Sequence, residues 1–285
     1  MGIFKYGLII VCCWVFNVQP TFAANENESS VWVRYSEDEN HLKDSLLDIN
    51  LALNTDTSLI LGAAETELPL FPNIPVLSRI VTTHEYNIGL STFSYFPWSI
   101  DVGLSYWGKD REMVKHTLYF NPNWNAEDWL LGFNFEFSDI DLYTAVLPSG
   151  QYRIETESIG AGPIVQFYFD NFSLGFFAMW YDYSEDPSRL STLSILILGN
   201  TRVHAGTLYD WYAGTSIQHT TGNIRTALTY QYSVLAIDQT TSDDIALSFS
   251  FGMSDNLQME LEFGRTYQER DVTIDYGTVS IGFYF

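Results

Sequence analysis

Apolar and polar residues alternate with a period of two along most of this chain, and the helical period of 3.6 is almost absent. In the segment 129–137 every odd position is apolar, and the positions between them include Gly132, Asn134 and Glu136. The same alternation recurs in four further segments: 47–53, 98–106, 244–251 and 257–264. A period of two places successive side chains on opposite faces of a β-strand, so the pattern predicts an all-β protein with half-buried strands.

Turns of two kinds separate the predicted strands. Short polar or proline-containing turns fall at six places: Asn54 to Thr57, Phe96-Pro97, Asn121 to Asp128, Asp170-Asn171, Thr220 to Asn223 and Ser254 to Asn256. Longer, more acidic connections fall between them: Glu37 to Asp44, Thr66 to Thr83, Gly108 to Glu112, Glu185 to Gly206 and Ile237 to Asp243. A soluble sandwich also has alternating strands. Short turns that alternate with long loops, however, are typical of a transmembrane barrel, whose short turns face the periplasm.

The order of turns and loops indicates the number of strands. If the last strand, about Asp271 to Phe285, ends in the periplasm, all the short turns and the N-terminus fall on that side, so the number is even. We predict an antiparallel up-and-down barrel of about 14 strands. This number pairs Trp129 to Val146 with Tyr152 to Tyr168 and treats Pro187 to Gly206 as a folded outer loop. Splitting both regions into strands gives 16, and losing the weak first strand, Val31 to Tyr35, with one neighbour gives 12.

The first 23 residues have the pattern of a secretory signal peptide. Lys5 supplies a positive charge, the segment Gly7 to Phe16 is apolar, and Thr21-Phe22-Ala23 places small residues where signal peptidase cleaves. The apolar run of about ten residues is shorter than the roughly 20 that a transmembrane helix needs. We expect cleavage near Ala23 and a single barrel domain over 24–285.

Composition narrows the classes of function. Both cysteines, Cys12 and Cys13, lie in the predicted signal peptide, so disulfides, zinc–thiolate sites and cysteine nucleophiles are not expected in the mature chain. The formal net charge of −22 argues against a nucleic-acid partner and fits a cation-preferring cavity or a solvated exterior. Aromatic residues make up 16% and charged residues only 17%, as expected where many side chains face lipid or its interface.

The chain ends in an apolar alternation at Val279, Ile281, Phe283 and Phe285. In this the sequence resembles Gram-negative outer-membrane β-barrel proteins, whose last strand ends in Phe with apolar residues at alternate positions before it. The resemblance implies a location in the outer membrane, contact with its lipid and lipopolysaccharide, and recognition of the last strand by the barrel-assembly machinery. The alternative is a soluble exported β-protein, but an apolar edge strand at the terminus is something that soluble proteins usually avoid.

Motifs for catalysis and metal binding are weak. The segment Gln218 to Asn223 distantly resembles the His-x-Ser-Asn motif of outer-membrane phospholipases and lipid A deacylases. Thr221 stands in place of Ser, however, and we interpret the segment as a hairpin turn built from turn-forming residues. Asp139-Ile140-Asp141 resembles the acidic pair of outer-membrane aspartate-type proteases, but His204 lacks an acid two residues away, and we interpret the pair as a solvated loop base. Phosphate-loop, zinc-protease and calcium-loop motifs are absent from the sequence. We expect no catalytic residue, metal site or cofactor.

The polar half of the alternation indicates the inner face of the barrel. Because a basic side chain facing lipid costs roughly 2–4 kcal/mol at the midplane and acids somewhat less, we expect the charged side chains of the strands to line the lumen. The candidates are Arg34, Asp48, Asp101, Lys115, Glu136, Arg225, Glu260 and Glu262. About 14 strands favour an open lumen, which we expect inward glycines at 103, 132, 264 and 282 to widen. The sequence thus indicates a monomeric, passive, porin-like channel for small cations or neutral polar solutes. Two alternatives stay open: a closed barrel for adhesion, surface binding or envelope organisation, and an outer-membrane hydrolase.

Overall fold

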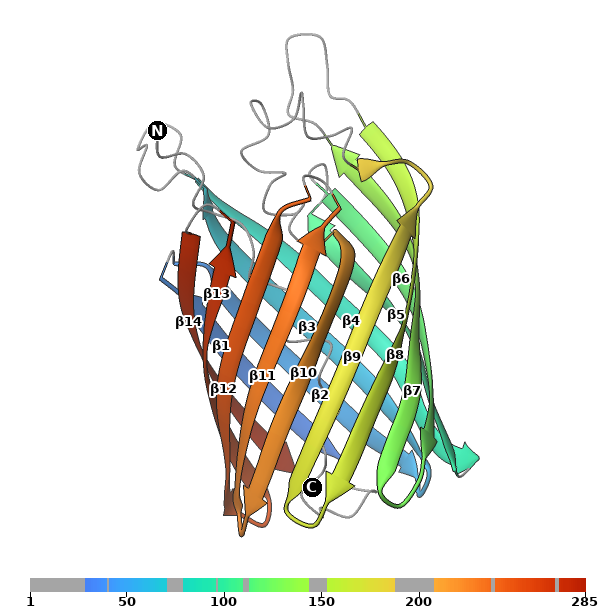
Figure 1. Cartoon of the computed structure of the whole chain (residues 1–285), viewed down its shortest axis with the longest axis vertical. Helices are drawn as coiled ribbons and strands as arrows, with labels where there is room; N and C mark the ends of the chain where they lie inside the picture. Colours follow the sequence, from blue (N-terminus) through green and yellow to red (C-terminus); the bar gives the residue numbers. More distant parts are fainter. Residues whose placement is uncertain are drawn as a thin grey trace.

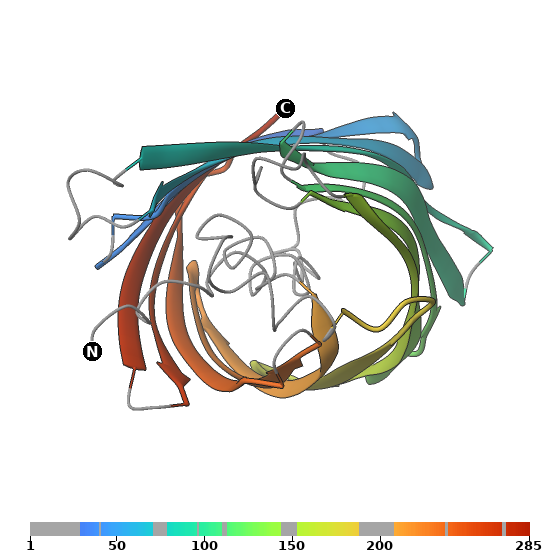
Figure 2. The same cartoon turned by 90° about the horizontal axis from the view of Figure 1, so that it is seen from above.

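The chain forms one closed ring of antiparallel strands (Figures 1 and 2). The computed structural model describes residues 29–39, 41–70, 79–95, 97–109, 113–143, 153–187, 208–236, 239–269 and 272–285. The fourteen strands are β1 Ser30–Asp38, β2 Lys43–Asn54, β3 Thr57–Leu70, β4 Arg79–Tyr95, β5 Trp98–Lys109, β6 Met113–Asn125, β7 Trp129–Tyr143, β8 Arg153–Phe169, β9 Phe172–Tyr183, β10 Tyr209–Thr221, β11 Ile224–Leu235, β12 Thr241–Ser254, β13 Leu257–Gln268 and β14 Val272–Tyr284.

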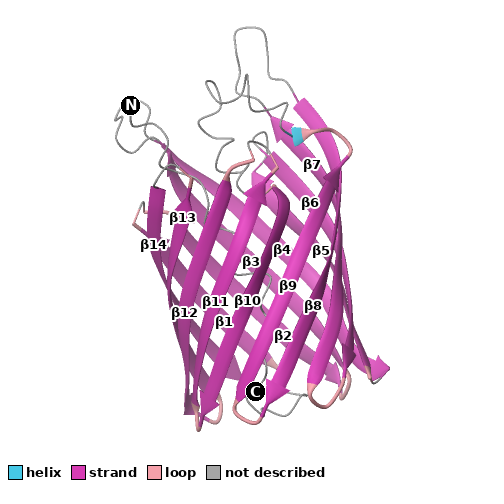
Figure 3. Cartoon of the chain, viewed as in Figure 1, coloured by secondary structure: helices cyan, strands magenta, loops and turns pink. Residues whose placement is uncertain are grey.

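Each strand pairs with its neighbours in sequence, and β1 pairs with β14 to close the ring. The predicted all-β, up-and-down barrel is confirmed with 14 strands, which excludes the alternatives of 12 and 16. The first strand is longer than predicted, because Ser30–Asp38 pairs along its whole length with Tyr284–Tyr276 of β14. Within the described residues no helix is long and apolar enough to cross a membrane, and almost all of them belong to strands (Figure 3).

All the predicted short turns lie at one end of the barrel, which we call the turn end (lower end of Figure 1). One of them is shorter than expected: the turn predicted at Asn121 to Asp128 is only the segment 126–128, because β6 continues through Pro122 to Asn125. Proline lacks the amide hydrogen that a strand ladder needs. The strand accommodates it at a gap in the pairing with β7, where the register passes from Phe120 directly to Asn123.

The outer surface carries a belt of exposed apolar side chains, the lipid belt. Leu104 is 57% exposed, Ile159 55% and Phe263 59%, and each alternates with polar or small residues that face the interior. Soluble proteins rarely expose so large a contiguous apolar surface. A transmembrane barrel requires such a band of apolar residues on its outer face.

Aromatic and charged side chains mark the two edges of this belt. At the turn end Trp98 and Trp124 meet with ring centroids 5.1 Å apart, and Phe169 and Phe172 are 6.0 Å apart. At the opposite end, the loop end, exposed outward positions carry charged side chains: Glu65, Asp139, Glu157 and Asp182. Aromatic rings favour the membrane–water interface, and charges favour water beyond it, so the strands extend past the lipid belt at the loop end.

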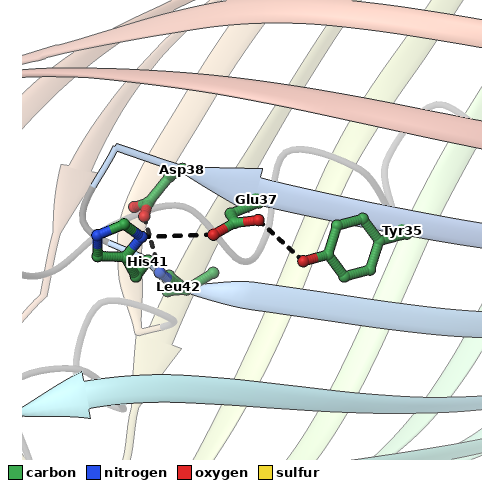
Figure 4. Close-up of polar contacts among 5 residues, drawn as sticks. All are labelled: Tyr35, Glu37, Asp38, His41 and Leu42. Carbon is green, nitrogen blue, oxygen red and sulfur yellow. Dashed lines mark hydrogen bonds and ion pairs between the residues drawn. The ribbon is translucent and has the colours of Figure 1, made fainter.

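The connection between β1 and β2 is a tight turn at the loop end (Figure 4). The Leu42 amide donates a hydrogen bond to Asp38 Oδ1 (2.8 Å), and the His41 amide donates to the Asp38 carbonyl oxygen (3.0 Å). His41 has a φ of 64°, in the left-handed region. Its Nδ1 lies 3.4 Å from Glu37 Oε1. The Glu37 carboxylate also accepts a hydrogen bond from the Tyr35 hydroxyl. Of the acidic stretch Glu37 to Asp44, expected as a longer loop, the first two and the last two residues therefore belong to β1 and β2.

The signal peptide predicted for residues 1–23 lies outside the described residues and stays a prediction, as does cleavage near Ala23. Most of the predicted outer loop Pro187 to Gly206, including its apolar stretch, also lies outside them.

Candidate functional site

The inner wall of the barrel is the candidate functional site, and the strand register defines it. Residues opposite one another in an antiparallel pair point to the same face. Arg34, for example, lies between the outward-facing Val33 (55% exposed) and Tyr35 (43% exposed) and is opposite Leu46 and Ser280. By the same register all the sequence candidates occupy inward positions: Arg34, Asp48, Asp101, Lys115, Glu136, Arg225, Glu260 and Glu262. Their role as the lining of an open lumen stays a prediction.

The structure brings only some of these candidates together. Arg225 Nη2 on β11 donates to Glu260 Oε2 on β13 at 3.2 Å, across the intervening strand β12. Arg34 Nη2 lies 4.0 Å from Asp44 Oδ2, and the side chains are 12% and 20% exposed. Asp101 contacts neither group and lies separately on β5.

Four inward carboxylates that the sequence analysis missed also belong to this wall: Asp38, Asp44, Glu85 and Asp244. Glu85 on β4 and Glu262 on β13 both lie within electrostatic range of Arg34 from opposite sides. Asp244 is 5% exposed and accepts hydrogen bonds from Thr266 Oγ1 (2.6 Å) and the Tyr276 hydroxyl (3.1 Å). Among the inward positions of the described strands, carboxylates outnumber basic side chains, so this wall favours cations electrostatically.

The inward glycines do not simply widen the interior, as the sequence suggested. Each is covered by a neighbouring side chain: Gly103 by Tyr119, Gly132 by Asn123, Gly264 by Tyr276 and Gly282 by Trp32. A Cβ at any of these positions would clash with the side chain that covers it. The glycines therefore let large side chains lie along the wall, and this packing replaces the expected empty space.

One side of the inner wall is aromatic and apolar. Its buried cluster, the aromatic wall, consists of Leu130, Ile164, Phe177, Met179, Tyr209 and Tyr212, with Tyr168, Tyr181 and Leu235 packed against it. These residues lie on β7 to β11, centred on β9. In the ring order β9 is seven strands from β2, so the two strands lie on opposite sides of the ring (Figure 2). The aromatic wall is therefore opposite β1 and β2, which carry Arg34, Asp44 and Asp48.

A second apolar cluster, the loop-end cluster, consists of Trp107, Ile140, Leu208 and Ala236, with Tyr183 packed against it. Trp107 lies on β5, whereas Leu208 directly precedes β10, so side chains from well-separated strands meet here. Ile140 is 0% and Leu208 1% exposed. The interior is therefore narrowed by packed side chains near the loop end on this side.

The candidate hydrolytic residues do not assemble into a site. His219 and Thr221 lie 3.4 Å apart (Nδ1 to Oγ1) at the turn end, and both are exposed on the outward face of β10. Asp139 and Asp141 point outward on β7, whereas Ile140 between them is buried inside. His204 lies outside the described residues. Among the described residues there is no group of three or more side chains that could hold a metal ion.

Comparison with known proteins supports the fold. No family model and no curated protein matches the sequence. A FadL homologue of Pseudomonas aeruginosa has a TM-score of 0.55 at 10% identity, over 90% of this chain and 90% of that one. NanC porin has a TM-score of 0.47 at 9% identity over 89% and 98% of the two chains. A loop-deletion mutant of OmpT, an outer membrane protein of Vibrio cholerae, has a TM-score of 0.48 at 7% identity over 90% and 98%. At such identities the likeness shows the fold alone, and the resemblance to outer-membrane β-barrels is confirmed at that level.

Proposed function

We propose that this chain is an outer-membrane channel through which small cations and neutral polar solutes diffuse passively. The observation that carries the proposal is the inner wall of the closed 14-strand ring, on which carboxylates outnumber basic groups. A ring of this size has room for a lumen, whereas a barrel of about eight strands is filled by its side chains. The lipid belt and its aromatic edge support a place in a membrane, and the apolar alternation along β14 supports a place in the outer membrane.

The test is single-channel recording of refolded protein in a planar bilayer under a potassium chloride gradient. We expect steady openings with a reversal potential on the cation-selective side. Replacing Glu136 and Glu260 together by Gln should lower the ratio of cation to anion permeability by roughly twofold or more, because two wall charges are lost. Glu157→Gln, on the outward face, is the matched control and should leave the ratio unchanged. Protein that inserts as a folded barrel but never conducts would rule out the channel.

The loop-end cluster favours a second candidate function, a closed barrel for adhesion, surface binding or envelope organisation. Its packed residues, among them Trp107 and Ile140, narrow the interior. A barrel that is closed there would be silent in the bilayer, and the same recording therefore separates the two functions.

A further inference from the structure

The position of Tyr181 on the aromatic wall is fixed from two directions. In the register Glu136, Gly160 and Tyr181 lie side by side on β7, β8 and β9. A Cβ on Gly160 would come within 2.6 Å of Tyr181 Cε1, so the ring lies over this glycine. The Tyr181 hydroxyl donates to Glu136 Oε2 at 3.1 Å. The ring therefore lies along the wall with a carboxylate at its polar edge.

The ammonium group of a lysine side chain lies near this ring. Lys115 Nζ lies 6.0 Å from the centroid of the Tyr181 ring. This distance is at the limit at which an ammonium group is attracted by the electron-rich face of an aromatic ring. Lys115, Tyr181 and Glu136 are all inward and partly exposed, so the arrangement combines an aromatic face, a carboxylate and a bound ammonium.

The aromatic surface continues beyond Tyr181 into an apolar region. Tyr183 stacks with Tyr181 at a centroid distance of 6.5 Å, and Tyr212 is tilted against it at 6.2 Å. Tyr212 in turn contacts Phe177 at 6.1 Å. Tyr212 is 2% and Phe177 4% exposed, so these two rings support Tyr181 from within the wall, whereas Tyr183 is only half-buried. A molecule held at Tyr181 by its charged end would thus have the Tyr183 ring beside its other end. A small hydrated inorganic cation makes no use of such a surface, because it keeps its water shell.

We propose that the inner wall binds organic ammonium compounds with an apolar or aromatic body, and that Lys115 is a tethered competitor for the same place. The ammonium group of the ligand lies over Tyr181 beside Glu136, and its body lies against the neighbouring Tyr183 ring. The carboxylates on the opposite side of the ring add attraction for positive charge. This inference rests on the open lumen of the proposed channel, through which the ligand reaches the wall, and not on conductance itself.

Calorimetric titration of the refolded barrel in detergent with benzyltrimethylammonium chloride tests the proposal without requiring conductance. We expect saturable binding. Lys115→Met should tighten it by roughly three- to tenfold, since the variant removes both the competitor and a repelling charge. Lys43→Met is the matched control, because Lys43 lies on the outward face of β2, and it should change nothing.

Three further variants examine the carboxylate and the ring. Glu136→Gln and Tyr181→Leu should each weaken binding by roughly threefold or more, and Tyr181→Phe should retain most of it, because the ring face is kept. If Tyr181→Leu fails to fold, Glu136→Gln carries the test.

The proposal is overturned if benzyltrimethylammonium shows no saturable binding, if neutral benzyl alcohol binds equally well, or if Lys115→Met weakens binding. Bilayer recording of the same preparation separates this failure from that of the channel. Conductance without ammonium binding would remove only the present inference, whereas binding without conductance would remove only the channel.

Discussion

Replacing Leu104 by Arg tests whether the exposed apolar belt faces lipid. Leu104 is 57% exposed at the middle of β5, and its register neighbours Ile88 and Leu118 are also exposed apolar residues. Because the side chain is so exposed, its replacement removes little packing. The change in unfolding free energy is therefore dominated by the cost of placing a charge in lipid. An arginine at the bilayer midplane of a barrel costs roughly 2–4 kcal/mol of unfolding free energy. This cost corresponds to a roughly 30- to 1000-fold lower ratio of folded to unfolded protein.

The assay is reversible urea unfolding in phospholipid vesicles, followed by heat-modifiable migration. The matched variant is Ser105→Arg on the same strand, because Ser105 points inward between Asn87 and Thr117. We expect Ser105→Arg to cost less than about 1 kcal/mol, because its charge faces a polar wall. Equal losses in the two variants would refute the assignment of the outward face to lipid.

Three further predictions concern packing, the width of the interior and assembly. Gly264→Val should lower the unfolding free energy by about 1–3 kcal/mol because it displaces the Tyr276 ring. Gly277→Ala should change it by less than about 0.5 kcal/mol, because its Cβ would meet nothing closer than 3.9 Å; urea unfolding measures both. Trp107→Ala should raise single-channel conductance by removing the largest side chain of the loop-end cluster, and unchanged conductance would place that cluster outside the conduction path. Phe285→Ser should lower the amount of folded barrel in cells but not the yield of refolding from urea; equal losses in both would argue against an assembly signal.

Sequence alternation predicts the strands and their faces well because the lipid belt demands apolar residues at every second position. In β13 the apolar positions Leu257 to Phe263 all face outward, as their period of two requires. Short turns such as Asp170-Asn171 then fix the number of strands, since each reverses the chain at the same end of the barrel.

The same logic explains the inward carboxylates that were missed. Asp44 and Glu85 lie near the loop end, where the strands extend past the lipid belt. Outward neighbours there need not be apolar: Ser45 flanks Asp44, and His84 flanks Glu85. The alternation of apolar and polar residues is therefore lost near the loop end, although the strands continue there. These positions are readable as inward only once the register is known.

A single sequence also does not predict that the inner wall is aromatic on one side and acidic on the other, for a different reason. Alternation tells inward from outward, but it carries no information about which strands face each other across the ring. On β9 alternation does not even tell inward from outward, because both faces are apolar. Phe177 and Met179 face inward, while Phe176 and Trp180 face lipid. Only ring closure places this strand opposite β2 and its carboxylates. If solutes are selected inside the barrel, the selection depends on that juxtaposition, and exchanging charges on one side alone should alter the preference among cations without abolishing binding to the aromatic wall.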